Sequence, residues 1–406
     1  LDNAFDGVPE VTQKPVKQGK TFRYEVKFPD TGMYWYHPHI REDYQQELGL
    51  YGNILVVPAE EKKKFNKEEY LILDDIQINK DDVSSYSQDF ATQALMGRFG
   101  NVMLVNGQTD YSLNANKGDV VRFYITNAAN TRTFNLEIPN ARIKVIGSDG
   151  GYYEKEFFTE NIIISPSERY IVDVLFDDAS SYEIKNTNPL KEYNLGNIEI
   201  SQEQSDEDFS AEFSDAKENE EVKKEFLSFK NYMNKPPDVE LVMDIKMAGM
   251  IQGEMMQNMD HSMHMGMLHA GEDGGIEWED TMAMMNFGST TDSVKWLLVD
   301  KKTGKANMDI SYEWEKGDYV KIRLFNDPNS MHPMQHPIHF HGNRFVVLSK
   351  DEIANENMVW KDTVLVPKGE TIDILLEVSN PGEWMVHCHI AEHLESGMML
   401  SFNVKE

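Results

Sequence analysis

Three short histidine clusters, one of which contains the only cysteine, supply most of the side chains in this sequence that could bind a transition metal. They hold eight of the 12 histidines, with the spacings H-x-H, H-x-x-H-x-H and H-C-H-x-x-x-H. The residues are His37, His39, His336, His339, His341, His387, Cys388, His389 and His393. Because side chains two residues apart in a strand share a face, an H-x-H pair can present two imidazoles together. In H-C-H the cysteine faces the opposite way, so one strand can serve two sites.

The donor types favour copper. A thiolate with two imidazoles and a weak thioether is the donor set of blue copper electron-transfer sites. Cys388, His393 and Met398 supply three of these donors at loop spacing, and His336 can supply the other imidazole. The remaining imidazoles alone would suit copper, zinc or iron. A structural zinc site needs about four ligands, and many more converge here. A lone cysteine is more often a buried apolar side chain, but these neighbours favour a metal ligand.

Composition excludes several classes of protein. The 406 residues include 69 acidic and 39 basic side chains, which gives a formal net charge of −30. Phosphate binding needs a basic surface, so we expect no nucleic acid partner. No apolar run reaches about eighteen residues, so we expect no membrane span. The single cysteine excludes an intramolecular disulfide, and the length indicates two to four domains.

Short segments alternate apolar and polar residues with a period of two, the pattern of half-buried strands. Residues 22–28, 121–126 and 320–324 follow this pattern, and Gly, Pro, Asn and Asp separate such segments. Long helical patterns are rare. We therefore predict an all-β fold of stacked β-sandwiches.

An internal repeat links the beginning of the chain to its end. Gly19 and Gly369 each precede the first histidine of an H-x-H or H-C-H motif by 18 residues, and Gly32 and Gly382 precede it by five. Such agreement indicates the same half of two duplicated sandwich domains. In the last unit the H-x-x-H-x-H cluster lies upstream of Gly369, and the same offset from Gly19 falls before residue 1. We therefore expect the chain to begin inside its first domain.

A second repeat links the middle of the chain to its end. Lys-Gly-Asp at residues 117–119 and at 316–318 each open an alternating strand. Downstream of the second lies the H-x-x-H-x-H cluster, whereas residues 133–136, at a similar distance from the first, contain no histidine. The strand after Ser167-Glu168-Arg169 also leads to no histidine pair. The middle domain is therefore expected to be structural and free of metal.

These patterns divide the chain into four parts. We predict an incomplete first domain at residues 1–60, a second domain without copper ligands at 61–200, an acidic linker at 201–237 and a third domain with the blue copper site at 238–406. Residues 201–222 are acidic and poor in apolar residues, which indicates a solvated loop. Residues 243–285 hold twelve of the 23 methionines and three histidines. This segment suits either Cu(I) handling or a flexible apolar cover over the blue copper site. Met331, His332 and Met334 are expected to shape the substrate entrance.

The metal motifs resemble those of a known family. W-Y-H-P-H at 35–39, H-P-I-H-F-H-G at 336–342 and H-C-H-I-A-E-H at 387–393, followed by Met398, resemble the copper motifs of three-domain, laccase-like multicopper oxidases. The resemblance extends over nearly the whole chain and implies tandem cupredoxin-like Greek-key β-sandwiches. It implies type 1 copper at His336, Cys388, His393 and Met398, type 2 copper at His339, and a coupled type 3 pair at His37, His39, His341, His387 and His389.

The resemblance also implies an activity. An electron from a phenol or aromatic amine would enter at type 1 copper through the more exposed imidazole of His393 and pass through Cys388 to His387 and His389. Four such electrons would reduce O2 to water. Two alternatives are a metallo-oxidase acting on Cu(I) and a copper-binding electron-transfer protein. The resemblance also implies a periplasmic or extracellular location.

One family motif, H-x-H-G, is absent, and residues 1–9 resemble the segment that directly follows it. The missing motif would supply one type 2 and one type 3 ligand. Asp6 resembles the family's acid beside the trinuclear site, where a carboxylate can hydrogen-bond metal-bound water and relay protons. The alternative is a turn aspartate before glycine. Leu394 occupies the position at which some relatives carry a second proton donor.

Overall fold

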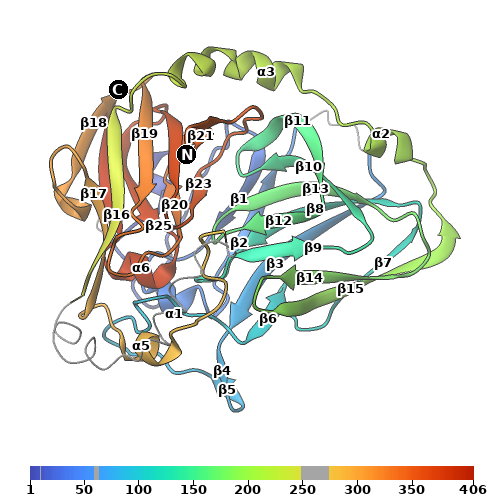
Figure 1. Ribbon diagram of the computed structural model, residues 1–406, viewed down its shortest axis with the longest axis horizontal. Helices are drawn as coiled ribbons and strands as arrows, with labels where there is room; N and C mark the ends of the chain where they lie inside the picture. Colours follow the sequence, from blue (N-terminus) through green and yellow to red (C-terminus); the bar gives the residue numbers. More distant parts are fainter. Residues whose placement is uncertain (10, 59–63, 248–273) are drawn as a thin grey trace.

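The computed structural model of the protein describes residues 1–406 except 10, 59–63 and 248–273. Two large β-sandwiches lie side by side, and a smaller segment near the amino terminus packs between them (Figure 1). This arrangement confirms the prediction of an all-β fold.

The second domain is a sandwich of a six-stranded and a five-stranded sheet. The six-stranded sheet has the order β11 (Gly151–Thr159), β10 (Arg142–Ser148), β13 (Arg169–Leu175), β8 (Val120–Asn127), β3 (Lys67–Ile76) and β6 (Val102–Val105). The five-stranded sheet has the order β12 (Asn161–Ile164), β9 (Phe134–Glu137), β14 (Ser181–Thr187), β15 (Glu192–Gln204) and β7 (Tyr111–Lys117). A short hairpin, β4 (Ile78–Asn79) and β5 (Asp82–Val83), projects from this domain.

The third domain repeats this layout. Its six-stranded sheet has the order β17 (Val294–Asp300), β16 (Val239–Met247), β19 (Tyr319–Asn326), β24 (Thr371–Glu377), β21 (Arg344–Lys350) and β22 (Ile353–Ala354). Its five-stranded sheet has the order β18 (Ser311–Glu315), β26 (Met399–Lys405), β25 (Gly382–Cys388), β20 (His336–Phe340) and β23 (Thr363–Val366). Parallel pairing recurs at equivalent places, β3 with β8 and β16 with β19. The duplication predicted from the Lys-Gly-Asp repeat is therefore confirmed.

The predicted alternation of exposure does not hold in β8. All eight of its residues are buried, because β8 is a central strand covered on both faces. One face packs into the sandwich, and Phe213 packs on Val120 over the other. Arg122 escapes the cost of burial through a bidentate pair with Asp173, at 2.8 and 3.0 Å.

The first-domain segment is small. It comprises the short 3-10 helix η1 (Asn3–Phe5), strands β1 (Gly32–Tyr36) and β2 (Gly52–Val56), which form a two-stranded antiparallel sheet, and helix α1 (Glu42–Gln45). The strand predicted at residues 22–28 is wrong. No strand pairing involves these residues within the described chain, and the side chains of Phe22, Tyr24 and Val26 are exposed. Residues 22–28 thus have neither a partner strand nor a face that is buried, although their apolar and polar residues alternate.

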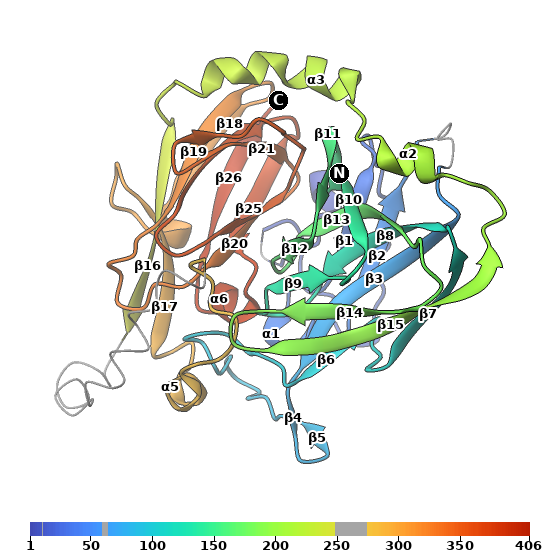
Figure 2. The ribbon, with the colours of Figure 1, turned by 45° about the vertical axis from the view of Figure 1, so that its right-hand side comes forward.

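The acidic linker 201–237, of which residues 201–222 were predicted to be a solvated loop, is more ordered than expected. It contains helix α2 (Ser210–Ser214), helix α3 (Glu220–Phe226) and the 3-10 helix η2 (Leu227–Tyr232). Three phenylalanines, Phe213, Phe226 and Phe229, are buried against the two sandwiches. Figure 2 shows this segment running over the top of the molecule from one sandwich to the other. The acidic composition of this segment gave no indication that these three widely spaced phenylalanines would be buried.

The remaining helices of the described residues belong to the third domain. They are α5 (Ala283–Gly288), the 3-10 helix η3 (Asn307–Asp309) and α6 (Ala391–Glu395). Helix α6 packs against α1 of the first-domain segment. Among the described residues, no helix is both long and apolar enough to cross a membrane.

Candidate metal centres

Three predicted donors meet between β20, the end of β25 and helix α6. Strand β20 pairs with β25, with Ile338 opposite Cys388. The Cys388 Sγ lies 3.6 Å from His336 Nδ1 and 3.8 Å from His393 Nδ1, and these two nitrogens are 3.3 Å apart. A nearly equilateral triangle of one sulfur and two imidazole nitrogens is the donor arrangement of a trigonal copper site.

Met398 lies next to this triangle. Its backbone carbonyl accepts a hydrogen bond from Cys388 N–H at 3.1 Å, and its own N–H donates to the carbonyl of His393 at 3.0 Å. The side chain is fully buried in the core of the third domain. The turn at Gly397, with φ of +100°, returns the chain from α6 to β26 and sets this position.

The whole thiolate site is buried, which contradicts one prediction. His336, Cys388 and His393 are at most 1% exposed, so His393 is not the exposed imidazole that we expected. Burial lowers the pKa of His336 to about 3 and lowers that of His393 well below its ordinary value. Burial also raises the pKa of the Cys388 thiol. Helix α6 turns the His393 ring inward, where Trp296 covers it.

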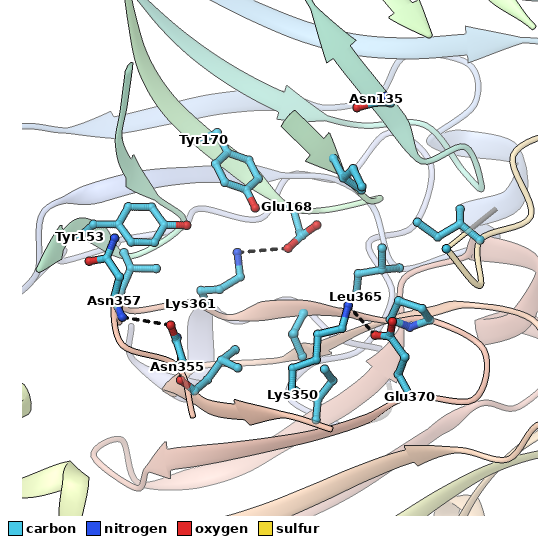
Figure 3. Close-up of a pocket in the computed structure, with 18 of the residues that line it drawn as sticks. Asn135, Tyr153, Glu168, Tyr170, Lys350, Asn355, Asn357, Lys361, Leu365 and Glu370 are labelled. Carbon is cyan, nitrogen blue, oxygen red and sulfur yellow. Dashed lines mark hydrogen bonds and ion pairs between the residues drawn. The ribbon is translucent and has the colours of Figure 1, made fainter. Parts of the chain in front are cut away.

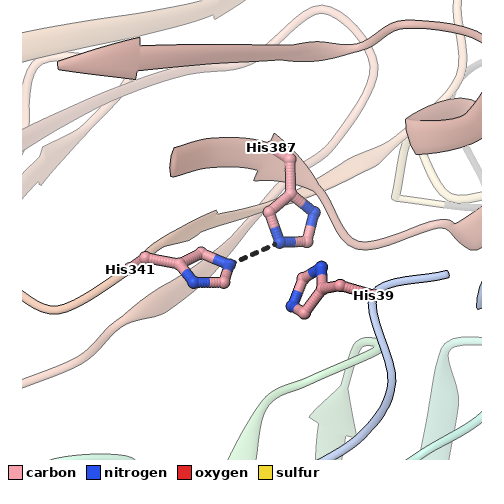
Figure 4. Close-up of side chains that lie close together, drawn as sticks. All are labelled: His39, His341 and His387. Atoms are coloured by element: carbon pink, nitrogen blue, oxygen red, sulfur yellow. Dashed lines mark hydrogen bonds between the residues drawn. The ribbon is translucent and has the colours of Figure 1, made fainter. Parts of the chain in front are cut away.

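A second cluster contains one histidine from the first-domain segment and two from the third domain. The ligand atoms of His39, His341 and His387 all lie within 4.8 Å of one another (Figure 4). His341 Nε2 is 3.1 Å from His387 Nε2. His387 and Cys388 point to opposite faces of β25, as the H-C-H spacing predicted, so one strand serves both clusters.

Two further imidazoles face each other beside this trio. His37 Nε2 lies 3.2 Å from His389 Nε2, and the indole of Trp35 stacks on His37 with ring centroids 4.3 Å apart. The His339 ring lies 4.8 Å from that of His341 and 5.8 Å from that of His389, again between centroids. The structure thus gathers all six remaining predicted imidazoles in one place.

Oxygen atoms on neighbouring segments contact the outer nitrogens of three of these rings. The Asp6 carboxylate lies 3.1 and 3.2 Å from His341 Nδ1. His339 Nδ1 lies 3.1 Å from the Asp362 carbonyl and 3.0 Å from Thr363 Oγ1. Such contacts fix the ring orientation and leave the other nitrogen for a metal. Asp6 is therefore placed on a predicted ligand, not in an isolated turn.

The third contact, between Glu42 and His39, was missed by the sequence analysis. Glu42 Oε1 lies 2.5 Å from His39 Nδ1, and both side chains are buried. Burial raises the pKa of Glu42 to about 7. The only available signal was the spacing H-x-H-x-x-E, which places the glutamate at the start of α1. No pattern in the sequence predicted that Asp362 would contact a histidine of this cluster. Its carboxylate pairs with Arg169 at 2.5 and 2.6 Å.

The donor sets fit metal binding. Burial lowers the pKa of His37 to about 3 and lowers the pKa values of His387 and His389 well below the ordinary value. These imidazoles are therefore neutral, and each offers a lone pair. Burial also lowers the pKa of His341, but Asp6 more than offsets this effect, so its pKa is raised. Neutral nitrogens about 3 Å apart in a buried space are the arrangement that a metal cation between them satisfies.

Other predicted features lie elsewhere. His261, His264 and His269 fall in residues 248–273, outside the described part of the chain. The second domain contributes no residue to any group of metal-binding side chains found among the described residues. A cavity of about 870 Å³ lies between the second and third domains (Figure 3). It is lined by Tyr153, Tyr170 and the Lys361–Glu168 ion pair, and by none of the predicted ligands.

The sequence matches family models for most of its length. Three models, each described as multicopper oxidase, match residues 2–61, 67–204 and 279–406. The chain is 26% identical to the multicopper oxidase mco of Staphylococcus aureus, over 98% of this chain and 73% of that protein. It is 24% identical to a laccase of Arthroderma benhamiae, over 98% of this chain and 68% of that protein. It is also 21% identical to the iron transport multicopper oxidase fio1 of Schizosaccharomyces pombe, over 98% of this chain and 64% of that protein.

Solved structures share the fold. A multicopper oxidase from Pseudomonas thermotolerans superposes with a TM-score of 0.69 at 23% identity, covering 100% of this chain and 84% of that one. A metallo-oxidase from Campylobacter jejuni superposes with a TM-score of 0.64 at 22% identity, covering 94% of this chain and 74% of that one. Together with the three domain matches, the shared cupredoxin-like fold and the clustered imidazoles, these findings show that the chain belongs to the multicopper oxidases, copper-dependent oxidoreductases that use O2.

Proposed function

We propose that the two clusters divide the copper ions as the family motifs imply. The thiolate triangle with Met398 would hold type 1 copper. The trio of His39, His341 and His387 would hold one type 3 ion, and the facing pair of His37 and His389 would contribute to the other. His339 would serve type 2 copper. The observation that supports this division most directly is which nitrogens face each other: His341 Nε2 lies 3.1 Å from His387 Nε2 and His37 Nε2 lies 3.2 Å from His389 Nε2, whereas His336 and His393 face Cys388.

Bound in these sites, copper would supply one-electron oxidation at the thiolate site and four-electron reduction of O2 to water at the histidine cluster. The chain supplies the connection between the two. Cys388 lies in one site, and its neighbours in the sequence, His387 and His389, lie in the other. Cys388 Sγ also accepts a hydrogen bond from Ile390 N–H at 3.4 Å, and the burial of all three donors excludes water.

Asp6 is proposed to orient His341 and to hold a proton close to where oxygen is reduced. Its carboxylate contacts His341 Nδ1 from the amino-terminal segment, so Nε2 is left to face His387. Leu394 is buried and apolar, and it packs with Val8 and Met385. It offers no second proton donor, which leaves Asp6 as the acid of this kind that the family pattern identifies.

The proposed reductants are phenols and aromatic amines, which lose one electron at a time. A second candidate is Cu(I) or another low-valent metal ion. Exposed methionine side chains favour it, because Met284 on α5 and Met331 before β20 both reach the surface of the third domain. Thioethers are soft ligands that suit Cu(I). The relatives named iron transport oxidase and laccase illustrate both classes.

Oxygen consumption by copper-loaded protein distinguishes these proposals. The assay compares hydroquinone with Cu(I), and Cys388→Ser serves as the control that removes the thiolate. We expect saturable consumption with hydroquinone that Cys388→Ser abolishes. Consumption with Cu(I) alone would select the metallo-oxidase. A blue protein that consumes no oxygen with either reductant would overturn the oxidase proposal in favour of an electron-transfer protein.

A further inference from the structure

No donor of the thiolate site reaches the surface, so a reductant cannot touch one. His336, Cys388 and His393 are each at most 1% exposed. The backbone of Leu95 also lies close to the His393 ring and partly offsets the lowering of its pKa by burial. An electron from outside must therefore cross another residue to reach the site.

Trp296, in the middle of β17, contacts both imidazoles of that site. Its indole stacks on His393 with ring centroids 4.2 Å apart and an angle of 28° between the planes. The same indole meets His336 edge-on, with centroids 4.9 Å apart at 70°. Within the described chain it is the only tryptophan with such ring contacts to the thiolate site. Its π system thus lies in van der Waals contact with both nitrogen ligands.

The indole is held rigidly in this position. Its Nε1–H donates to the Ala94 carbonyl at 2.8 Å, and its backbone pairs with Ile245 of β16. The segment that contains Ala94 is in turn fixed to the third domain. Leu95 N–H donates to Ser289 Oγ at 2.9 Å, and Met96 N–H donates to Asn286 Oδ1 at 3.0 Å. A ring anchored from two domains keeps a constant distance to the site.

A third imidazole, which belongs to His332 and not to the thiolate site, lies near Trp296. The His332 ring has its centroid 6.2 Å from the indole, at 55°. His332 is nearly buried, and its Nε2 has no hydrogen-bond partner in the described structure. The next residue outward, Met331, is 48% exposed. Met331, His332 and Trp296 therefore lead from the surface to His393.

We propose that Trp296 is the relay through which an electron from an outside reductant, arriving on the Met331–His332 side, reaches the thiolate site. This inference rests on the proposed oxidase function. In each step the reductant loses one electron and the site gains it, while the indole begins and ends in the same state. A phenol also releases its hydroxyl proton to solvent. Trp296 is thus a positioning residue that couples the reductant to the ligands.

The test follows the bleaching of the blue band by hydroquinone without oxygen, in stopped flow, on copper-loaded protein. Trp296→Leu removes the ring, and Trp296→Phe keeps an aromatic ring in place. We expect Trp296→Leu to slow bleaching about tenfold or more and Trp296→Phe to recover much of the rate. The band, the copper content, the reduction potential and reoxidation by O2 should remain as in the unmodified protein. Trp314→Leu is the matched control, because Trp314 packs on Phe402 in the same domain.

The outcomes separate this inference from the proposed function. Unmodified protein that shows no blue band, or a band that hydroquinone does not bleach, would contradict the proposed function itself. Normal bleaching by unmodified protein and by Trp296→Leu alike would overturn the relay. So would slow bleaching that a changed reduction potential accounts for. If Trp296→Leu binds no copper, Trp296→Phe and His332→Ala decide: unchanged bleaching in both overturns the relay, and slower bleaching in either with an unchanged potential supports it.

Discussion

Two segments of the molecule are copies of one structural unit with different chemistry. The first copy, residues 32–56, and the last copy, residues 382–405, each run from a strand through a histidine pair and a short helix to a second, antiparallel strand. The helices α1 and α6 pack against each other. Each copy carries a buried glutamate three residues after its second histidine, Glu42 and Glu392, and burial raises the pKa of each to about 7.

Three replacements distinguish the copies. Cys388 of the last copy stands where the first has Pro38, His393 where it has Asp43, and Met398 where it has Leu48. The surroundings of these positions also differ. In the first copy Asp43 pairs with Arg41 at 2.8 Å and Leu48 is exposed. The three residues of the last copy are buried together. In the proposed assignment, the shared histidine pair serves the trinuclear copper centre in both copies. Of the two copies, only the last therefore carries the donors of the thiolate site.

The copies also differ in what supports them. Strand β25 lies inside a five-stranded sheet, between β26 and β20, so its histidines have neighbours on both sides. Strand β1 pairs only with β2 within the described residues. The last copy therefore holds three donors of the thiolate site, to which His336 of β20 adds the fourth, and two imidazoles of the histidine cluster, whereas the first copy holds two donors in all.

The strongest test of the comparison is the residue between the two histidines. Cys388→Ser should abolish both the blue band and oxidase activity, because Cys388 is the only thiol. The matched change in the first copy, Pro38→Ser, should leave the band in place. Absorption spectra and oxygen consumption of the two variants give the answer. A Cys388→Ser protein that remained blue would refute the assignment of the thiolate site.

Copper content tests how far the number of donors limits the occupancy of each copper site. In protein of residues 1–406, the thiolate site has four donors, whereas His339 is the only proposed imidazole for type 2 copper. We expect full type 1 occupancy, depleted type 2 copper and slow reduction of O2. Copper analysis and electron paramagnetic resonance on protein of verified mass measure this. A fully loaded trinuclear centre with fast oxygen consumption would contradict the ligand count.

The sequence predicted the parts of the site that depend on strand geometry and repetition. Spacing alone placed Cys388 and the flanking histidines on opposite faces of one strand, and the Lys-Gly-Asp repeat predicted the second sandwich. Contacts between distant segments could not be predicted in this way. The burial of His393 depends on Trp296 and Leu95, which are far from it in the sequence. The alternating pattern at residues 22–28 failed because alternation does not supply a partner strand.

Asp6→Asn tests whether the trio depends on its outer carboxylates. Asparagine keeps an oxygen near His341 but removes the charge, so reoxidation by O2 should slow by about 10- to 100-fold while hydroquinone still bleaches the blue band normally. Stopped-flow measurement of each half-reaction separates the two effects. Glu42→Gln is the matched change at His39 of the first copy. Equal loss of both half-reactions in Asp6→Asn would indicate a structural turn residue instead.

Met398→Leu makes the last copy resemble the first, which carries Leu48 at this position. The variant should keep its copper and its blue band, because three donors remain. Its reduction potential should rise, since a weak axial donor that favours the oxidised ion is lost. A redox titration monitored by the blue band measures the change, with Met385→Leu as the control in the same domain. An unchanged or lower potential would argue against Met398 as the axial ligand.

The smallest expected effect concerns Glu47, which stands where the last copy has Gly397. Burial, together with Asp75, Asp74 and Glu392, raises the pKa of Glu47 well above its ordinary value. A carboxyl with a raised pKa binds its proton more tightly in the folded state than in the unfolded state. Its contribution to stability is therefore complete below about pH 4.3 and is lost as the pH rises towards the folded-state value.

Glu47→Gln should remove this loss, because the amide is neutral and its oxygen can still accept the hydrogen bond from Gln77 N–H. We expect the free energy of unfolding of the metal-free protein to rise by about 1–3 kcal/mol at pH 8 and to change little at pH 4. Urea unfolding at the two pH values measures the difference, with the exposed Glu203→Gln as the control. An equal loss of stability at both pH values would show that the glutamate contributes through packing and not through its charge. The charge of Glu47 in the first copy would then not lower the free energy of unfolding, and the contrast with Gly397 of the last copy would not be an electrostatic one.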